Sequence, residues 1–154
     1  MTPPRLTAAD IACWVIKSRT PPEALLPGWQ RGSTRELARC VRRSYRVELM
    51  QPGQRCVLWL SGREAPGVHA IGHLVSPVAD PAELGPDEGE ARVTTRLHLL
   101  TEPVPRPALL ADPVFVAAEV LKMPAGSNPS YLSLPAWAAL EEYLSPTDRQ
   151  LAGW

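Results

Sequence analysis

Eighteen prolines are distributed along a chain of 154 residues, and they limit how long any helix or strand can be. Proline removes a backbone donor and interrupts helix interiors and central strands, so it usually marks the ends of elements. The prolines here lie at the edges of apolar segments and are not gathered in one tail. We therefore expect several short elements around one core, in a single domain over residues 1–154.

Short apolar segments between the prolines predict a sheet. Residues 11–17 are rich in Ile, Trp and Val, which favours a buried strand. Residues 56–62 and 68–76 are apolar runs separated by a Pro-Gly turn, which predicts an antiparallel hairpin. Residues 91–100 alternate apolar and polar side chains, as a half-buried strand does.

Helix signals occur between and after these strands. Ser33 and Glu36 form a capping-box pattern, so we expect a helix from there to about Tyr45. Residues 133–144 predict a second helix, residues 107–112 predict one helical turn, and residues 114–123 fit a helix or a strand. The predicted fold class is α+β: a curled mixed sheet or barrel of about five strands, flanked by two or three helices.

The formal net charge is zero, but the two signs are segregated along the chain. Residues 80–90 hold five acids and no Lys or Arg, and we expect them to form an exposed loop. The opposite pole has one acid, Glu36, among six arginines. The six are Arg31, Arg35, Arg39, Arg42, Arg43 and Arg46.

On the predicted helix, four of these arginines fall on one face, at spacings where like charges repel. Phosphate groups would turn that repulsion into attraction, so we expect the six arginines to contact phosphates. A solvated helix face is the alternative. Trp29, between Gly28 and Gly32, also has two interpretations: a buried anchor for its loop, or a platform on which a base stacks.

The histidines and cysteines do not show the spacing of a metal site. His69 and His73 on one strand would lie ~13 Å apart, too far to share an ion. The three cysteines are dispersed, as expected for reduced, mostly buried thiols. We expect no metal and no cofactor. No apolar run approaches the ~20 residues that span a bilayer, and the N-terminus lacks the apolar core of a secretion signal, so we expect a cytoplasmic protein.

Three segments together resemble the EVE domain of the PUA-like superfamily, which is similar to the YTH domain. Residues 14–18, WVIKS, resemble the first strand of that family. Residues 52–77 resemble its central hairpin, and residues 123–144 its closing Gly-Ser-rich turn and Trp-bearing helix. The family pattern Gly-x-Trp-x-Gly is changed here, because Trp29 is shifted by one position between its glycines.

The resemblance implies a bacterial, non-catalytic module that binds DNA or RNA and accepts one flipped, modified base, such as a modified cytosine. The strands would supply the pocket floor and the loops its wall and rim. Carried over by position, the base-pocket residues are Lys17, Ser18, Trp29, Trp59, Ser61, Gly62, Ser127 and Asn128. The resemblance leaves the oligomeric state open, a monomer included.

Two other functions remain open. An enzyme acting on RNA or nucleotides, similar to the ASCH domains of the same superfamily, would use Lys17 as its reactive group, with a pKa lowered by burial. No acid or histidine is placed by a motif to assist that lysine. A protein-interaction or nucleotide-binding domain would instead use the pocket for a small molecule, with the acidic segment as its other surface.

Overall fold

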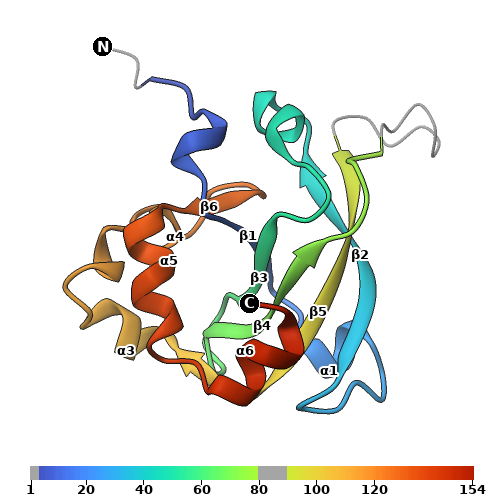
Figure 1. Ribbon diagram of the computed structural model, residues 1–154, viewed down its shortest axis with the longest axis vertical. Helices are drawn as coiled ribbons and strands as arrows, with labels where there is room; N and C mark the ends of the chain where they lie inside the picture. The colour runs from blue at the N-terminus through green and yellow to red at the C-terminus, as the bar shows by residue number, and fades with distance from the viewer. Residues whose placement is uncertain (1–3, 80–89) are drawn as a thin grey trace.

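The computed structural model describes residues 4–79 and 90–154. Residues 80–89 of the predicted acidic loop therefore lie outside the described part. A curled six-stranded sheet with the strand order β2-β5-β4-β3-β1-β6 forms the centre of the molecule (Figure 1). This mixed sheet with flanking helices confirms the predicted α+β class. The strands are β1 (Cys13–Ser18), β2 (Thr34–Arg42), β3 (Arg55–Leu60), β4 (Gly67–Leu74), β5 (Glu90–Pro105) and β6 (Ser130–Leu132).

Helices gather mainly on one side of this sheet, where Figure 1 shows α3, α4 and α5 opposite β2. The prediction of a helix over residues 133–144 is confirmed by α5, and the ambiguous residues 114–123 contain two short helices, residues 115–117 and 119–122. None of the described helices is long and apolar enough to cross a membrane. The α-helices are α1 (Pro22–Leu25), α3 (Arg106–Leu110), α4 (Glu119–Lys122), α5 (Leu134–Glu141) and α6 (Pro146–Ala152). The 3-10 helices are η1 (Ala8–Asp10), η2 (Tyr45–Leu49) and η3 (Phe115–Ala117).

The predicted helix after Ser33 is wrong, because this segment is strand β2. It pairs with β5 along its whole length, from Thr34 opposite His98 to Arg42 opposite Glu90. The Ser33 hydroxyl donates to the carbonyl of Gln30 and caps no helix. The pairing with β5 satisfies the backbone groups on one side of β2 over nine residues, which outweighs a capping signal confined to one end of the segment.

The strand also divides the arginines differently from a helix. Side chains alternate between the two faces of a strand. Arg35 and Arg39 therefore share a face with Leu37 and Val41, which pack against the core, whereas Arg42 lies on the opposite face. The prediction that four arginines share one helix face is therefore wrong.

Alternation on β1 builds two apolar cores, one on each face of the sheet. Trp14 and Ile16 enter the core inside the curl, which we call the barrel core. Cys13 and Val15 enter the core beneath the helices, which we call the helix-side core. The predicted hairpin is confirmed, because β3 and β4 pair in antiparallel, while β1 and β3 pair in parallel.

Strand β5 is longer than predicted and continues through Pro103. Its register against β4 shifts between Val68, opposite Val104, and Ala70, opposite Leu99. Several residues of β5 therefore face a single residue of β4, and Pro103 lies in this irregular stretch. A bulge tolerates proline because a residue in the bulge does not need to donate a backbone hydrogen bond to the neighbouring strand.

A buried polar cluster holds α6 against β5. Asp148 is 3% exposed, and its Oδ1 lies 2.8 Å from Nε2 of His98. Its Oδ2 accepts hydrogen bonds from the hydroxyl of Thr101 at 2.9 Å and from the Thr101 amide at 3.3 Å. Burial alone would raise the pKa of Asp148, but the hydrogen bonds from His98 and Thr101 outweigh it and lower that pKa.

Replacing Asp148 by Asn should destabilise the protein, because His98 and Thr101 would lose a charged acceptor inside the fold. We expect Asp148→Asn to lower the free energy of unfolding by roughly 3 kcal/mol at neutral pH. Thr101→Val, which removes one hydroxyl donor, should cost about 1 kcal/mol. Urea denaturation followed by tryptophan fluorescence measures both.

The pH dependence follows from the lowered pKa of Asp148 in the folded state. A carboxylate of this kind stabilises the fold fully above its ordinary pKa, and that stabilisation is lost as the pH falls through the folded value. The gap between the parent protein and Asp148→Asn should therefore narrow in acid. An undiminished gap at about pH 2 would contradict the assignment.

Candidate nucleic-acid interface

A pocket of about 600 Å³ opens where β1 and β3 end. The two strands are parallel, so their carboxyl ends meet at the same edge of the sheet. The amide of Ser61 donates to the carbonyl of Ser18 at 2.8 Å and holds the two ends together. We call this hollow the strand-end pocket. Its lining is Lys17, Ser18, Arg19, Ser61, Gly62, Pro124, Ala125, Gly126 and Asn128.

Asn128 fastens the loop of residues 124–129 to β1. Its Oδ1 accepts from the Lys17 amide at 2.7 Å, and its Nδ2 donates to the Lys17 carbonyl at 2.9 Å. The side chain thus makes the pair of hydrogen bonds that a neighbouring strand would make. Asn128 forms one wall of the pocket by holding this loop in place.

Lys17 is half-buried beneath the same loop. Its ammonium group donates to the carbonyl of Gly126 and, at 3.5 Å, to that of Met123. Burial lowers the pKa of Lys17, and Arg46 adds to this, while Glu119 opposes it. The direction agrees with the expectation from sequence. Two of the hydrogen bonds that the ammonium group can donate are therefore used to hold the loop.

The serines and glycine of the pocket lie at the strand ends. Ser18 is 5% exposed, and its hydroxyl donates to the Thr20 carbonyl and accepts from the Thr20 amide, so it shapes the turn after β1. Ser61 is half-buried. Gly62 has a φ of +120°, a conformation that suits glycine and lets the chain leave β3 sharply.

A second hollow, of about 580 Å³, lies on the other side of the same loop. Ala125, Gly126 and Asn128 line both cavities, so only the loop separates them. Arg42, at the end of β2, donates its amide to the carbonyl of Asn128 at 2.9 Å. The far edge of the sheet thus curls back to the loop before β6. We call this second cavity the arginine hollow, after Arg42, Arg43 and Arg46 in its lining.

The guanidinium group of Arg46 makes contacts that stabilise the fold. It makes two hydrogen bonds to the carboxylate of Glu119, both at 2.8 Å, and a third to the carbonyl of Pro129 at 2.9 Å. The Ser130 hydroxyl also donates to Glu119 at 2.8 Å. The Glu119 hydrogen bonds raise the pKa of Arg46, and the Arg46 hydrogen bonds lower the pKa of Glu119. This bidentate pair ties η2 to α4 and β6.

The other predicted phosphate contacts are dispersed. Arg31 donates to the carbonyl of Leu100 at 3.1 Å. Arg35 is exposed on β2. Arg39 is half-buried, its Nε has no hydrogen-bond partner among the described residues, and burial lowers its pKa. Of the six arginines, the structure brings Arg42, Arg43 and Arg46 together at one hollow.

Neither predicted tryptophan lines the strand-end pocket. Trp29 is 4% exposed in the barrel core, and its indole donates to the carbonyl of Ser33 at 3.1 Å. Trp59 is 3% exposed, and its ring is stacked 6.5 Å from that of Phe115. Of the two interpretations of Trp29, the buried anchor matches the structure. Ser127 lines the arginine hollow and not the strand-end pocket.

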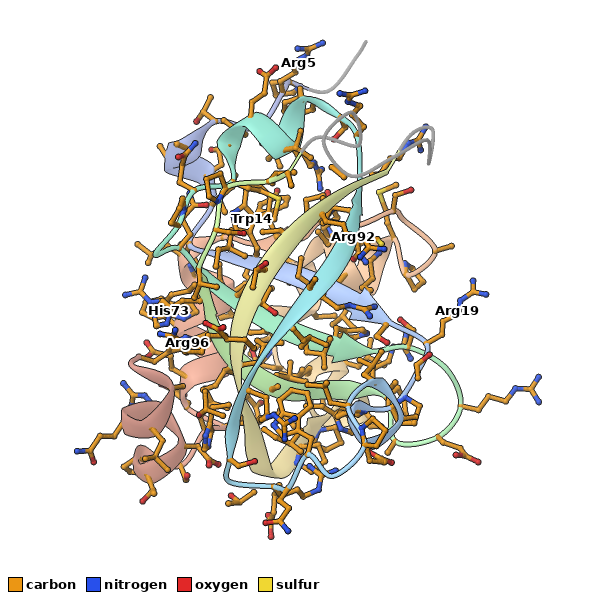
Figure 2. All side chains as sticks on the ribbon, turned by 90° about the vertical axis from the view of Figure 1, so that its right-hand side faces the viewer. Arg5, Trp14, Arg19, His73, Arg92 and Arg96 are labelled. Carbon is orange, nitrogen blue, oxygen red and sulfur yellow. The ribbon has the colours of Figure 1, made fainter. Side chains whose placement is uncertain are left out.

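Sequence reasoning missed Arg19 and residues 124–126 as pocket residues. Arg19 directly follows the WVIKS segment, and Figure 2 shows its side chain extending away from the sheet at the pocket's edge. The position of Arg19 could have been found from the end of the predicted strand. The loop could not, because its contact with Lys17 joins segments more than a hundred residues apart.

The described residues contain no group of three His, Cys, Asp or Glu side chains that could hold a metal ion. The three cysteines are free thiols. Cys13 and Cys56 are buried and Cys40 is exposed. Burial raises the pKa values of the Cys13 and Cys56 thiols, which favours their neutral, unreactive form.

No protein-family model and no curated protein matches this chain. Solved structures share its fold. A hypothetical protein from Leishmania major is 15% identical with a TM-score of 0.67, over 94% of this chain and 99% of that one. A Pseudomonas putida protein is 17% identical with a TM-score of 0.63, over 85% and 98%.

Human THYN1, solved in complex with DNA containing 5-methylcytosine, is 12% identical with a TM-score of 0.53, over 85% of this chain and 96% of that one. At such identities these comparisons define the fold of the chain. With its curled mixed sheet and flanking helices, that fold is PUA-like, as predicted.

Replacing Asn128 by Ala should loosen the loop between the two cavities. The variant loses both hydrogen bonds to the Lys17 backbone, and we expect the free energy of unfolding to fall by about 1–2 kcal/mol. Hydrogen exchange at the Lys17 amide should accelerate. Ser127→Ala, at an exposed position on the same loop, is the matched control and should leave both measurements unchanged. Unaltered exchange at Lys17 in Asn128→Ala would contradict the role of Asn128.

Proposed function

We propose that the chain is an EVE-type nucleic-acid-binding module that receives one unpaired base in the strand-end pocket and adjacent phosphates in the arginine hollow. The observation that carries this proposal is the single loop, residues 124–129, that lines both cavities. A base and the phosphate beside it are covalently joined and must be held next to each other. Two adjoining cavities of different chemistry meet that requirement.

The unused hydrogen-bonding capacity of the pocket suits an acceptor-rich base edge. An ammonium group has three protons, and two carbonyls account for two of those of Lys17. The amide of Asn128 has two protons, and one goes to the Lys17 carbonyl. Ser61 adds a hydroxyl. The adjacent N3 and O2 atoms of cytosine are both acceptors, and they match such a set of donors.

Recognition of the base faces would differ from the aromatic stacking expected from sequence. None of the described residues that line the strand-end pocket is aromatic. The guanidinium plane of Arg19 can stack on an exposed base, as arginine does in RNA-binding proteins. Pro124 and Ala125 present apolar surface, which is the kind that contacts a methyl group at C5 of a pyrimidine.

A modified cytosine in DNA is the ligand that we propose. THYN1 was solved with DNA that contains 5-methylcytosine, and it has the same fold. The donor set and the apolar loop of this chain are compatible with such a base. Arg42 is the residue that we expect to contact phosphate, since its side chain is exposed at the hollow, whereas Arg46 holds the loop through Glu119.

Binding to DNA should weaken with salt in proportion to the phosphates contacted. We expect Arg42→Gln to reduce the slope of log affinity against log salt by about 0.7 on single strands and about 0.9 on duplex DNA. Fluorescence anisotropy with labelled oligonucleotides measures the slope. Arg35→Gln removes another exposed arginine of β2, on the opposite face of the strand, and should leave the slope unchanged. Equal effects of the two substitutions would argue against the arginine hollow.

Base preference tests the strand-end pocket separately. We expect tighter binding of an oligonucleotide with 5-methylcytosine than of its plain counterpart, and loss of this preference in Lys17→Met. Lys122→Met, at an exposed lysine of α4, is the matched control. Equal affinity for both oligonucleotides would refute the proposed ligand. Cleavage of the oligonucleotide that disappears in Lys17→Met would favour the enzymatic alternative instead.

A further inference from the structure

A third cavity, of about 410 Å³, lies at the opposite ends of the strands that form the strand-end pocket. Cys13 and Trp14 at the start of β1, and Gln54 and Arg55 at the start of β3, contribute to its lining. Each residue of a strand advances about 3.3 Å, so this cavity lies roughly 16 Å from the strand-end pocket along β1. We call it the strand-start pocket.

Three basic side chains form a row across the sheet at this level. Arg55 of β3 lies opposite His73 of β4, and His73 lies opposite Arg96 of β5. Directly paired residues share a face of the sheet, and Figure 2 shows His73 and Arg96 next to each other. Arg96 has an anionic partner, since it donates to Glu36 at 2.7 Å. Among the described residues, no carboxylate forms an ion pair with Arg55 or His73.

Arg55 is held in a defined orientation by an aromatic ring. Its guanidinium carbon lies 4.0 Å from the ring centroid of Trp137 in α5. A guanidinium stacked in this way keeps its N–H groups in the plane, directed sideways, where they can form a forked pair of hydrogen bonds with an oxyanion. The side chain is half-buried, so an anion bound there would be only partly screened by water.

His73 lies close to positively charged side chains. Burial lowers its pKa most, and the charges of Arg55 and Arg96 lower it further. Gly153, at the end of α6, packs against the imidazole and brings no charge. An anion between Arg55 and His73 would offset this repulsion and favour the protonated imidazole.

We propose that the strand-start pocket binds the phosphate group of a small molecule between Arg55 and His73. The volume lies within the range of small-molecule sites, and Leu134 of α5 and Gly153, which follows α6, contribute to the lining. A nucleic-acid strand held at the strand-end pocket would have to pass along the molecule to reach it. The ligand that we propose is a small molecule and not this strand, and the inference does not depend on the function proposed above.

The experiment is a titration of the full chain with inorganic phosphate, followed by the backbone amide signals in NMR spectra. Saturable shifts should appear at Gln54, His73 and Gly153. Arg55→Gln should weaken binding at least tenfold. Arg55→Lys should weaken it severalfold, because lysine keeps the charge and loses the planar fork. Arg92→Gln, which removes a charge that Figure 2 shows away from His73, should have no effect.

A second titration uses sulfate, whose charge is constant across neutral pH. Any pH dependence of sulfate binding therefore reports protonation of the protein and not of the ligand. Binding should strengthen as the pH falls and His73 gains its proton, and His73→Gln should abolish this dependence. Dispersed spectra of each variant confirm that it is folded. The absence of saturable shifts, or equal losses in Arg55→Gln and Arg92→Gln, would overturn the proposal.

A titration with a short single-stranded oligonucleotide distinguishes a small-molecule phosphate from a phosphate of the nucleic-acid backbone. Under the proposal, the oligonucleotide shifts amides near Ser61 and Gly126 and leaves those of Gln54 and His73 in place. Shifts at Gln54 and His73 at lower concentrations than phosphate requires would assign the row to the nucleic-acid backbone and overturn a small-molecule site. Because the two pockets report through different amides, failure of either proposal is visible separately.

Discussion

The parallel pairing of β1 with β3 is the constraint on which the rest of the structure depends. It places Trp14 opposite Cys56 and Ser18 opposite Leu60, and so joins two segments about 40 residues apart. A parallel pair has both amino ends at one edge and both carboxyl ends at the other. The strand-end pocket and the strand-start pocket follow from this geometry, one at each end. An antiparallel pair would have brought Ser18 next to Arg55.

The curl of the sheet then adds the arginine hollow. Strands β2 and β6 are the two edges of the sheet, yet the amide of Arg42 reaches the carbonyl of Asn128. The side chain of the same asparagine is bonded to the backbone of Lys17 in β1. One residue therefore links the first strand, the far edge strand and the loop between two cavities. These bonds account for a polar side chain at a half-buried position that lines both cavities.

The sequence predicts the elements whose signals are local. Residues 11–17, the hairpin and the last helix each have a pattern within one segment, and all three form as expected. The apolar residues of the segment after Ser33 fit the period of a helix and also that of a strand. Leu37 and Val41 lie four residues apart, a spacing that places them on one face of a helix and also on one face of a strand. Pairing with β5, some sixty residues away, decides between the two, and no local pattern contains that information.

The candidate site was predicted in part for the same reason. Lys17, Ser18, Ser61 and Gly62 lie at the ends of strands that local patterns predicted, and the resemblance assigned all four residues to one pocket. Trp29 was not separable from a core residue, because a tryptophan between glycines fits a buried anchor as well as an exposed platform.

The arginines show most clearly what a sequence leaves undetermined. A guanidinium that meets a carboxylate has its charge offset and its donors used, so it contributes rigidity and not attraction for a ligand. Arg46 meets Glu119 from 73 residues away and belongs to that group. Within the described residues, Arg42 and Arg55 have no such ion pair, and each lines a cavity. Clustering along the chain made Arg42 and Arg46 look equivalent and gave Arg55 no prominence. The distribution of carboxylates in the fold reverses that ranking, and it is the reason why we propose Arg42 and Arg55, and not Arg46, as the arginines that contact anions.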